Sequence, residues 1–171
     1  MRAKLRAVPE DELERCHIAA LRILNYRWNS EAELRRKLAS KRFEKDVIET
    51  TVARLRKEKW LDDERFAEAF VRTKALKKIG RGKIKGALRA AGVDSESAER
   101  AIRANLDPEK ELEGLRAACA KRMRMLVRRH GEEFLDTDEG RNKLTAWLLN
   151  QGYDAALVHS TIKELKVVDH Q

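Results

Sequence analysis

The sequence predicts an all-α protein, built as an elongated, curved array of three tandem three-helix repeats. Two observations carry this prediction. The composition favours helix, because Ala, Leu, Glu, Lys and Arg are abundant while only two prolines and eight glycines occur among the 171 residues. In addition, one pattern of apolar residues recurs three times along the chain, and such recurrence is typical of repeat proteins.

Each copy of the pattern has three apolar residues with fixed spacing, and a fourth apolar residue nine positions later. The copies are Leu34-x3-Leu38-x4-Phe43, Ile84-x3-Leu88-x4-Val93 and Leu144-x3-Leu148-x4-Tyr153, followed by Val52, Ile102 and Ile162. They are offset by 50 and 60 residues, and Arg42 of the first copy is matched by Gly92 and Gly152. A unit of this size buries only a small core, so we expect neighbouring repeats to pack against one another.

The elements follow from these repeats and their boundaries. We expect helices over residues 11–27, 30–41, 44–58, 63–79, 82–91, 95–105, 108–130, 139–151 and 154–166. The corresponding division is a flexible extension 1–10, repeats 11–61, 62–106 and 107–167, and a tail 168–171. The segments near 61–63 and 105–108 join the repeats, and we expect bending there.

Local signals place several helix starts. Ser30 followed by Glu33 predicts a capping box, in which the Ser hydroxyl accepts from the Glu33 amide and the Glu33 carboxylate returns to the Ser amide. Asp94 and Asp154 stand where the next helices need an N-cap. Asp107-Pro108 predicts a capped start with proline in the first turn.

Other signals place helix ends. Gly92 and Gly152 fall where a helix C-terminus favours a left-handed residue. The helix that starts at Pro108 should run to His130 and end at Gly131, with basic residues at its negative end.

The charge points to a polyanionic partner. The formal net charge is +9, and segment 72–89 contains no acidic residue. Its basic residues are Arg72, Lys74, Lys77, Lys78, Arg81, Lys83, Lys85 and Arg89. The turn Ile79-Gly80-Arg81-Gly82-Lys83 precedes a helix whose free N-terminal amides would favour a phosphate. An ordinary solvated helix face is the alternative, but exposed helices commonly mix charges.

A second acid-free run, 116–129, is spread around its predicted helix, so part of it is expected to be structural. Arg124, Arg128 and Arg129 are its candidate contacts with nucleic acid or a filament. The aromatic residues mostly stand at helix ends or at core spacing, with no paired aromatics in strands. We therefore expect recognition of the backbone without sequence preference.

Catalysis finds no support in the sequence. Asp62 and Asp63 are explained by an acidic helix start, and Gly82-Lys83 lacks the remaining residues of a phosphate-binding loop. Cys16-His17 has no partner pair at zinc-ligand spacing. We expect no catalytic residue, no metal and no cofactor. Two distant cysteines, no signal peptide and no long apolar stretch predict a cytoplasmic protein without a disulfide framework or a membrane span.

Three ordered stretches resemble the RecX family of bacterial recombination regulators. They are Ser30-Glu31-Ala32-Glu33-Leu34-Arg35-Arg36-Lys37-Leu38, Leu61-Asp62-Asp63-Glu64-Arg65-Phe66-Ala67, and Ile84-x3-Leu88-x3-Gly92-Val93. With the triple repeat, the resemblance covers roughly residues 12–166. The chain has Lys78-Ile79-Gly80-Arg81 where the family usually has Gly-aromatic-Gly-Pro, and Ala91 where it usually has Lys.

The resemblance implies a non-enzymatic regulator, acting as a monomer. RecX-like proteins bind the RecA recombinase, especially its filament on single-stranded DNA, and commonly inhibit its ATP hydrolysis and strand exchange, which regulates homologous recombination, DNA repair and the SOS response. We expect affinity for single-stranded DNA and also for duplex DNA. The expected contact residues are Lys74, Lys77, Lys78, Arg81, Lys83, Lys85, Arg89, Arg124, Arg128 and Arg129. Two alternatives stay open: a helical repressor that recognises duplex DNA, and an enzyme with an unrecognised site.

Overall fold

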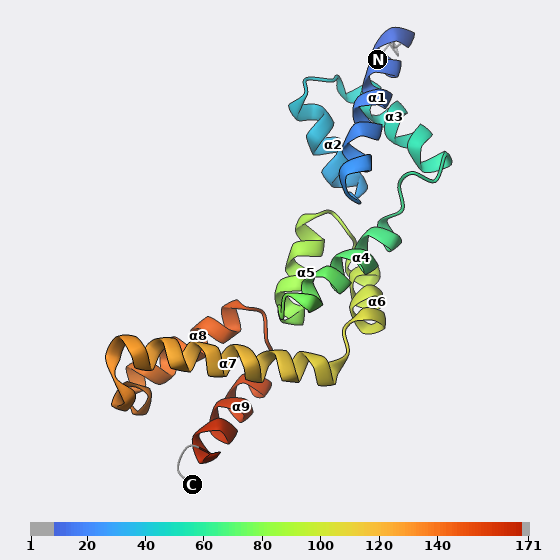
Figure 1. Cartoon of the computed structure of the whole chain (residues 1–171). Coiled ribbons are helices and arrows are strands. Elements are labelled where there is room, and N and C mark those ends of the chain that lie inside the picture. The colour runs from blue at the N-terminus through green and yellow to red at the C-terminus, as the bar shows by residue number, and fades with distance from the viewer. Residues whose placement is uncertain (1–8, 169–171) are drawn as a thin grey trace, which may run out of the picture.

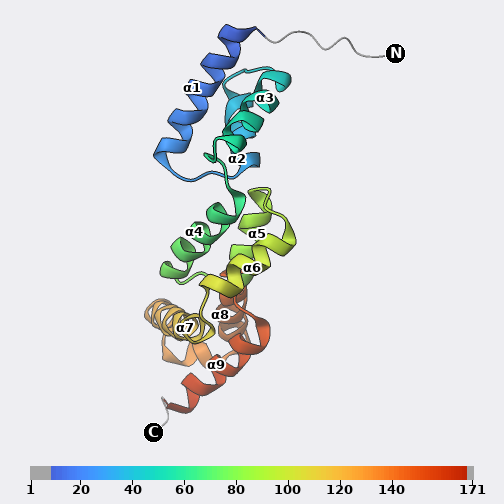
Figure 2. The ribbon, with the colours of Figure 1, turned by 90° about the vertical axis from the view of Figure 1, so that its right-hand side faces the viewer.

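A computed structural model describes residues 9–168 of the chain, and it is helical throughout that range apart from turns and short linkers. The predicted extension 1–10 and tail 168–171 therefore lie almost entirely outside the described residues. The helices stack into an elongated, curved array, with α1 at one end and α9 at the other (Figures 1 and 2). The fold class predicted from the sequence is confirmed.

Three groups of helices follow one another along the chain. The first is α1 (Glu10–Tyr26), α2 (Glu31–Ser40) and α3 (Lys45–Lys57); the second is α4 (Asp63–Leu76), α5 (Arg81–Ala90) and α6 (Ser95–Asn105). The third is α7 (Pro108–His130), α8 (Asp138–Asn150) and α9 (Ala155–Val168), with a 3-10 helix, η1 (Glu132–Asp136), between α7 and α8. We call these groups repeats 1, 2 and 3.

Each repeat has its own hydrophobic core, and the recurring apolar pattern supplies its centre. Leu34 and Leu38, Ile84 and Leu88, and Leu144 and Leu148 are all buried at matching positions in three separate clusters. A leucine buried in this way stabilises its repeat by several kcal/mol relative to alanine, on the order of 2–5 kcal/mol. The pattern therefore identifies the core residues correctly.

Most predicted helix ends are confirmed by their hydrogen bonds. Asp94 accepts from the amides of Glu96 and Ser97, and Asp107 accepts from the amide of Glu109. Asp154 caps α9 in the same way. Arg42, Gly92 and Gly152 all have positive φ, at 66°, 86° and 87°, so the three matched turns share one left-handed conformation.

Two local predictions were wrong. The helix expected to reach residue 79 ends at Leu76, because Lys78 adopts φ 54° and the Ile79 amide turns back to the Lys74 carbonyl. The capping box is only half formed: Ser30 Oγ accepts from the Glu33 amide at 3.1 Å, but the Glu33 carboxylate pairs with Arg27 at 2.9 Å. The Ser30 hydroxyl donates to the Ala91 carbonyl of repeat 2.

Neighbouring repeats meet through one recurring contact. The N-terminus of the short helix of one repeat, α2 or α5, packs on the left-handed turn that follows the short helix of the next repeat. Ala32 lies against Gly92, and fifty residues later Gly82 lies against Gly152. Gly80, at the position of Ser30, donates its amide to the Gln151 carbonyl at 3.0 Å. The hydrogen bond from Ser30 to Ala91 therefore joins repeats 1 and 2, and the one from Gly80 to Gln151 joins repeats 2 and 3, across the two junctions where we expected bending.

Candidate nucleic-acid interface

The basic segment 72–89 spans the last turns of α4, a tight turn and α5. Most of its cationic side chains are exposed. Four of them have no ion-pair partner among the described residues, namely Lys77, Lys78, Lys83 and Arg89. Lys74 is half-buried, and its Nζ lies 5.0 Å from the centre of the Phe70 ring. These five residues form the available part of the predicted site.

The start of α5 is not a free anion site, and this expectation was wrong. The Gly80 and Gly82 amides donate to the Gln151 and Gly152 carbonyls at 3.0 and 2.9 Å. The Arg81 amide donates to Oε1 of Glu111 at 2.9 Å. All three N-terminal amides are thus occupied by repeat 3, so no donor is left there for a phosphate.

Arg81 itself belongs to the same junction. Its guanidinium donates to Oε2 of Glu111 at 2.9 Å, and the Glu111 side chain is only 3% exposed. The hydrogen bond with Glu111 raises the pKa of Arg81 above its ordinary value. Removing the Arg81 side chain would leave the buried Glu111 carboxylate without its ion-pair partner, which is costly. Arg81 therefore acts first as a structural residue between repeats 2 and 3.

Lys85 is also held within the protein. Its ammonium pairs with Glu99 of α6, and this hydrogen bond lowers the pKa of Glu99. The matching residues of repeat 1, Arg35 and Glu49, form the equivalent pair between α2 and α3 at 3.0 Å. Because the pair recurs at the same register in two repeats, it is explained by packing between helices rather than by ligand binding.

The second predicted group lies apart from the first. Arg124, Arg128 and Arg129 are exposed near the C-terminal end of α7, with no ion-pair partner among the described residues. In Figure 1 this end of α7 points away from α5. Arg124 and Arg128 share a helix face, because they are one turn apart. The structure therefore does not combine the ten predicted residues into one patch.

Three exposed aromatic residues line a groove that the sequence did not predict. Tyr26, Trp28 and Trp60 stand at helix ends, as expected, yet they are 90%, 48% and 51% exposed. All three line one groove of about 670 Å³ beside repeat 1. A position at a helix end predicts that a residue lies near a loop, but it does not predict whether the side chain packs inward. Only the structure distinguishes these exposed residues from buried aromatics such as Phe66.

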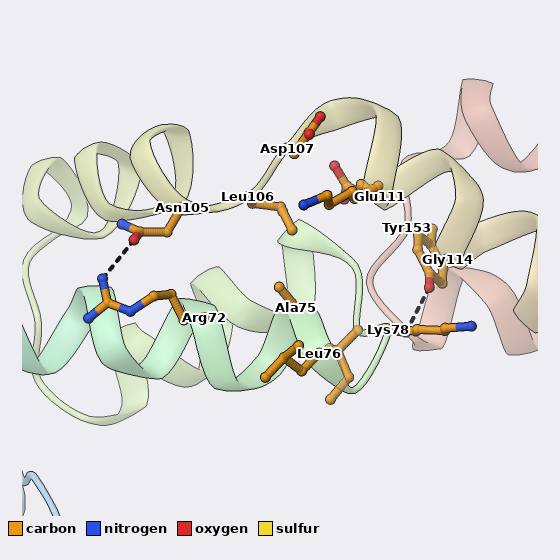
Figure 3. Close-up of a pocket in the computed structure, with 12 residues that line it drawn as sticks. Arg72, Ala75, Leu76, Lys78, Asn105, Leu106, Asp107, Glu111, Gly114 and Tyr153 are labelled. Atoms are coloured by element: carbon orange, nitrogen blue, oxygen red, sulfur yellow. Dashed lines mark hydrogen bonds between the residues drawn. The ribbon is translucent and has the colours of Figure 1, made fainter.

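A cavity of about 360 Å³ lies between repeats 2 and 3 (Figure 3). Its lining includes Leu76 and Ile79 of repeat 2 and Lys110 and Gly114 of α7. The Tyr153 hydroxyl donates to the Lys78 carbonyl at 2.7 Å at one edge, and burial raises the pKa of this tyrosine to about 12. The tyrosine thus fixes the turn that presents Lys77 and Lys78.

No catalytic arrangement emerges from the described residues. Burial raises the pKa of both thiols, and that of Cys119 reaches about 11, so neither is an activated nucleophile. In the range 9–168, no group of three or more acidic, histidine or cysteine side chains is arranged to hold a metal ion. None of the described helices is long and apolar enough to span a membrane.

Comparison with known proteins gives a consistent result. The family models described as "RecX, first three-helix domain" and "RecX, second three-helix domain" match residues 16–55 and 62–102. The regulatory protein RecX of Clostridium perfringens (strain 13 / Type A) is 34% identical over 158 residues, 92% of this chain and 72% of that protein. That of Clostridium beijerinckii is 29% identical and covers 97% of this chain and 76% of its own.

Solved structures also cover the third repeat, which the two family models do not. The crystal structure of RecX from Lactobacillus salivarius superposes with a TM-score of 0.74 at 25% identity. The match covers 93% of this chain and 99% of that one. The curated relatives and the solved structure therefore both align with all three repeats.

Proposed function

We propose that this chain, which belongs to the RecX family of regulatory proteins, binds the RecA recombinase and its filament on single-stranded DNA and inhibits ATP hydrolysis and strand exchange. Family membership is the observation that carries the proposal. Regulation of homologous recombination and DNA repair would follow from this inhibition. The protein acts by binding, as a monomer and without a cofactor or catalytic residue of its own.

The architecture supports a filament as the partner. Three small cores joined end to end give a long, narrow molecule (Figure 2), and such a shape fits a helical groove better than a single pocket. Repeats that each touch a different protomer bind cooperatively, because linked weak contacts gain from effective concentration. The hydrogen-bonded junctions fix the spacing between repeats, which limits the entropy lost on binding.

The available cations support a contact with phosphate or with acidic protein surface. Exposed lysine and arginine side chains bind the nucleic-acid backbone without reading sequence. The contact residues that we retain are those without an internal carboxylate partner. They are Lys74, Lys77, Lys78, Lys83 and Arg89 in repeat 2, and Arg124, Arg128 and Arg129 in repeat 3.

Co-sedimentation tests this proposal directly. RecA filaments formed on single-stranded DNA with a slowly hydrolysed ATP analogue are pelleted in the presence of the chain. We expect the chain in the pellet only when filament is present. Single-stranded DNA alone and RecA alone serve as controls. A chain that stays in the supernatant at equimolar filament, yet binds duplex DNA at one sequence, would instead indicate a duplex-specific repressor.

A further inference from the structure

The linker between α1 and α2 presents an aromatic side chain between two grooves. Trp28 lines the first groove together with Tyr26, the last residue of α1, and Trp60, which follows α3. It also lines a second groove of about 440 Å³, whose other wall is formed by Phe70 and Lys74 of α4. One half-exposed indole thus connects repeat 1 with the start of the basic segment in repeat 2.

The conformation that exposes Trp28 is held by its neighbours. The Arg27 guanidinium donates to the Trp28 carbonyl at 2.8 Å and to the Glu33 carboxylate at 2.9 Å. The side-chain Nδ2 of Asn29 donates to the Arg27 carbonyl at 2.6 Å. The side-chain Oδ1 of Asn29 accepts from the Lys37 ammonium, also at 2.6 Å. These hydrogen bonds hold the linker in a conformation that leaves the Trp28 indole about half exposed.

The charge around the two grooves is positive. Their carboxylates, Glu58 and Glu33, are each paired with an arginine, at 2.8 Å to Arg54 and 2.9 Å to Arg27. Lys59 and Lys74 line the grooves without an ion-pair partner among the described residues. An apolar peptide would gain nothing from these lysines, whereas a polyanion would.

Lys59 stands in a conformation that costs free energy. Its φ is 61°, in the left-handed region where glycine is preferred, and the Trp60 amide closes the turn on the Leu55 carbonyl at 2.9 Å. A residue held in an unfavoured conformation is a reason to look for a function at that place. Here the strained residue puts a cation beside an exposed indole.

Exposed aromatic faces beside unpaired cations match one partner chemistry best. Single-stranded nucleic acid offers unstacked bases and a phosphate backbone together, whereas the bases of a duplex are already stacked. We propose that the junction of repeats 1 and 2 stacks unpaired nucleobases on Trp28 and Trp60, while Lys59 and Lys74 hold the adjoining phosphates. The inference rests on the proposed affinity for single-stranded DNA and assigns the site of base contact.

The first test compares two labelled strands of equal length by fluorescence anisotropy: an oligothymidylate and its abasic counterpart. The wild-type chain should bind the oligothymidylate at least about fivefold more tightly, which is the smallest effect expected from one stacked base. Trp28→Ala and Trp60→Ala should each reduce that difference, and the double variant should remove it, without changing the abasic affinity. Leu157→Ala, at an exposed leucine of α9, is the matched control and should leave both affinities unchanged.

A second readout does not depend on truncating the site. The third tryptophan, Trp147, is partly buried against the core of repeat 3, so Trp147→Phe leaves the two junction indoles as the remaining tryptophan emitters. Stacked bases should quench their emission when oligothymidylate saturates the variant. Unchanged emission at saturation would overturn the proposal, even if Trp28→Ala proves poorly folded by circular dichroism.

The outcomes separate this inference from the proposed function. Equal affinity for the thymidylate and abasic strands, unaltered by the tryptophan substitutions, overturns base stacking but leaves filament binding intact in the co-sedimentation assay. Loss of co-sedimentation in Trp28→Ala with unchanged oligonucleotide affinity would assign this surface to protein contact, and it also overturns the inference. No binding of any oligonucleotide by the wild-type chain overturns both the inference and the proposed affinity for single-stranded DNA.

Discussion

Three basic residues, Arg42, Lys59 and Lys78, end helices in the left-handed conformation with φ between 54° and 66°. Side chains with a Cβ pay roughly 1–2 kcal/mol there, whereas glycine adopts the conformation without that cost. At the turn that follows the short helix, Gly92 and Gly152 of repeats 2 and 3 take the place of Arg42. The chain thus keeps cations at positions where glycine would be more stable.

Arg42→Gly should therefore raise the free energy of unfolding, by about 0.5–1 kcal/mol after the larger unfolded-state entropy of glycine is subtracted. Urea denaturation followed by circular dichroism measures the change. Lys57→Gly, within the helical end of α3, is the control and should lower stability by a similar amount. A loss of stability in Arg42→Gly would show that the arginine side chain contributes more than its backbone costs.

Glu31 predicts a dependence of stability on pH. Hydrogen bonds from Arg56, together with those from Arg35, hold the pKa of Glu31 below its ordinary value of 4.5. A lowered pKa in the folded state stabilises the fold above the ordinary value, and this contribution disappears as pH falls through the lowered pKa. Asp63 beside it acts in the opposite sense, because burial raises its pKa.

Glu31→Gln should consequently be less stable than the wild-type chain at pH 7, and the difference should shrink in acid. Thermal melts between pH 7 and pH 3 measure both. Glu113→Gln serves as the control because Glu113 is exposed on α7 and forms no ion pair among the described residues. A difference that stays constant with pH would mean that packing, not the carboxylate charge, carries the effect of Glu31.

At the scale of elements, glycine decides how closely the repeats approach. A Cβ on Gly80 would lie 2.4 Å from the Gly152 carbonyl carbon, a backbone atom that cannot turn aside. Gly86 lies within α5, the helix that Gly80 precedes, and a Cβ there would meet no atom of a neighbouring element within 4 Å. Substituting alanine at Gly80 therefore tests the close contact at the junction, whereas the same substitution at Gly86 tests helix propensity alone.

Gly80→Ala should destabilise the contact between repeats 2 and 3 by more than about 1 kcal/mol, because the backbones must separate and the hydrogen bonds of the junction are lost. Gly86→Ala should instead stabilise α5 by about 0.5–1 kcal/mol. Hydrogen exchange of the Gly82 and Arg81 amides, combined with thermal melts, measures both changes. Equal behaviour of the two variants would mean that the junction does not constrain the fold.

The sequence predicts elements better than it predicts their partners. Helices with apolar residues at regular spacing and an aspartate cap, such as α6 and α7, match the expected bounds because those signals are local. The Glu33 carboxylate and the α5 amides were assigned wrongly, because their partners come from Arg27 and from repeat 3. Whether a side chain at a helix end faces the core or the solvent depends on how neighbouring helices pack. The spacing of Trp28 and Trp60 along the sequence therefore could not predict their exposure.

At the scale of the whole molecule, binding should depend on salt through the cations that have no internal partner. For single-stranded DNA, the slope of log K against log salt changes by about 0.7 for each phosphate contact. Combined Lys77→Gln, Lys78→Gln and Lys83→Gln substitutions should flatten this slope by up to about 2. Arg100→Gln, which removes a cation paired with Glu64 and Glu96, is the control and should leave the slope unchanged. A slope that the triple variant does not alter would place the DNA contact elsewhere.

The proposed inhibition of RecA is tested by measuring RecA ATP hydrolysis on single-stranded DNA while the chain is titrated. If the chain occupies the filament as proposed, it should lower the hydrolysis rate progressively, with saturation below one chain per RecA protomer because one elongated molecule would contact several protomers. Wild-type chain with RecA omitted controls for any hydrolysis of its own. Unchanged hydrolysis at equimolar chain and RecA would contradict the proposed function.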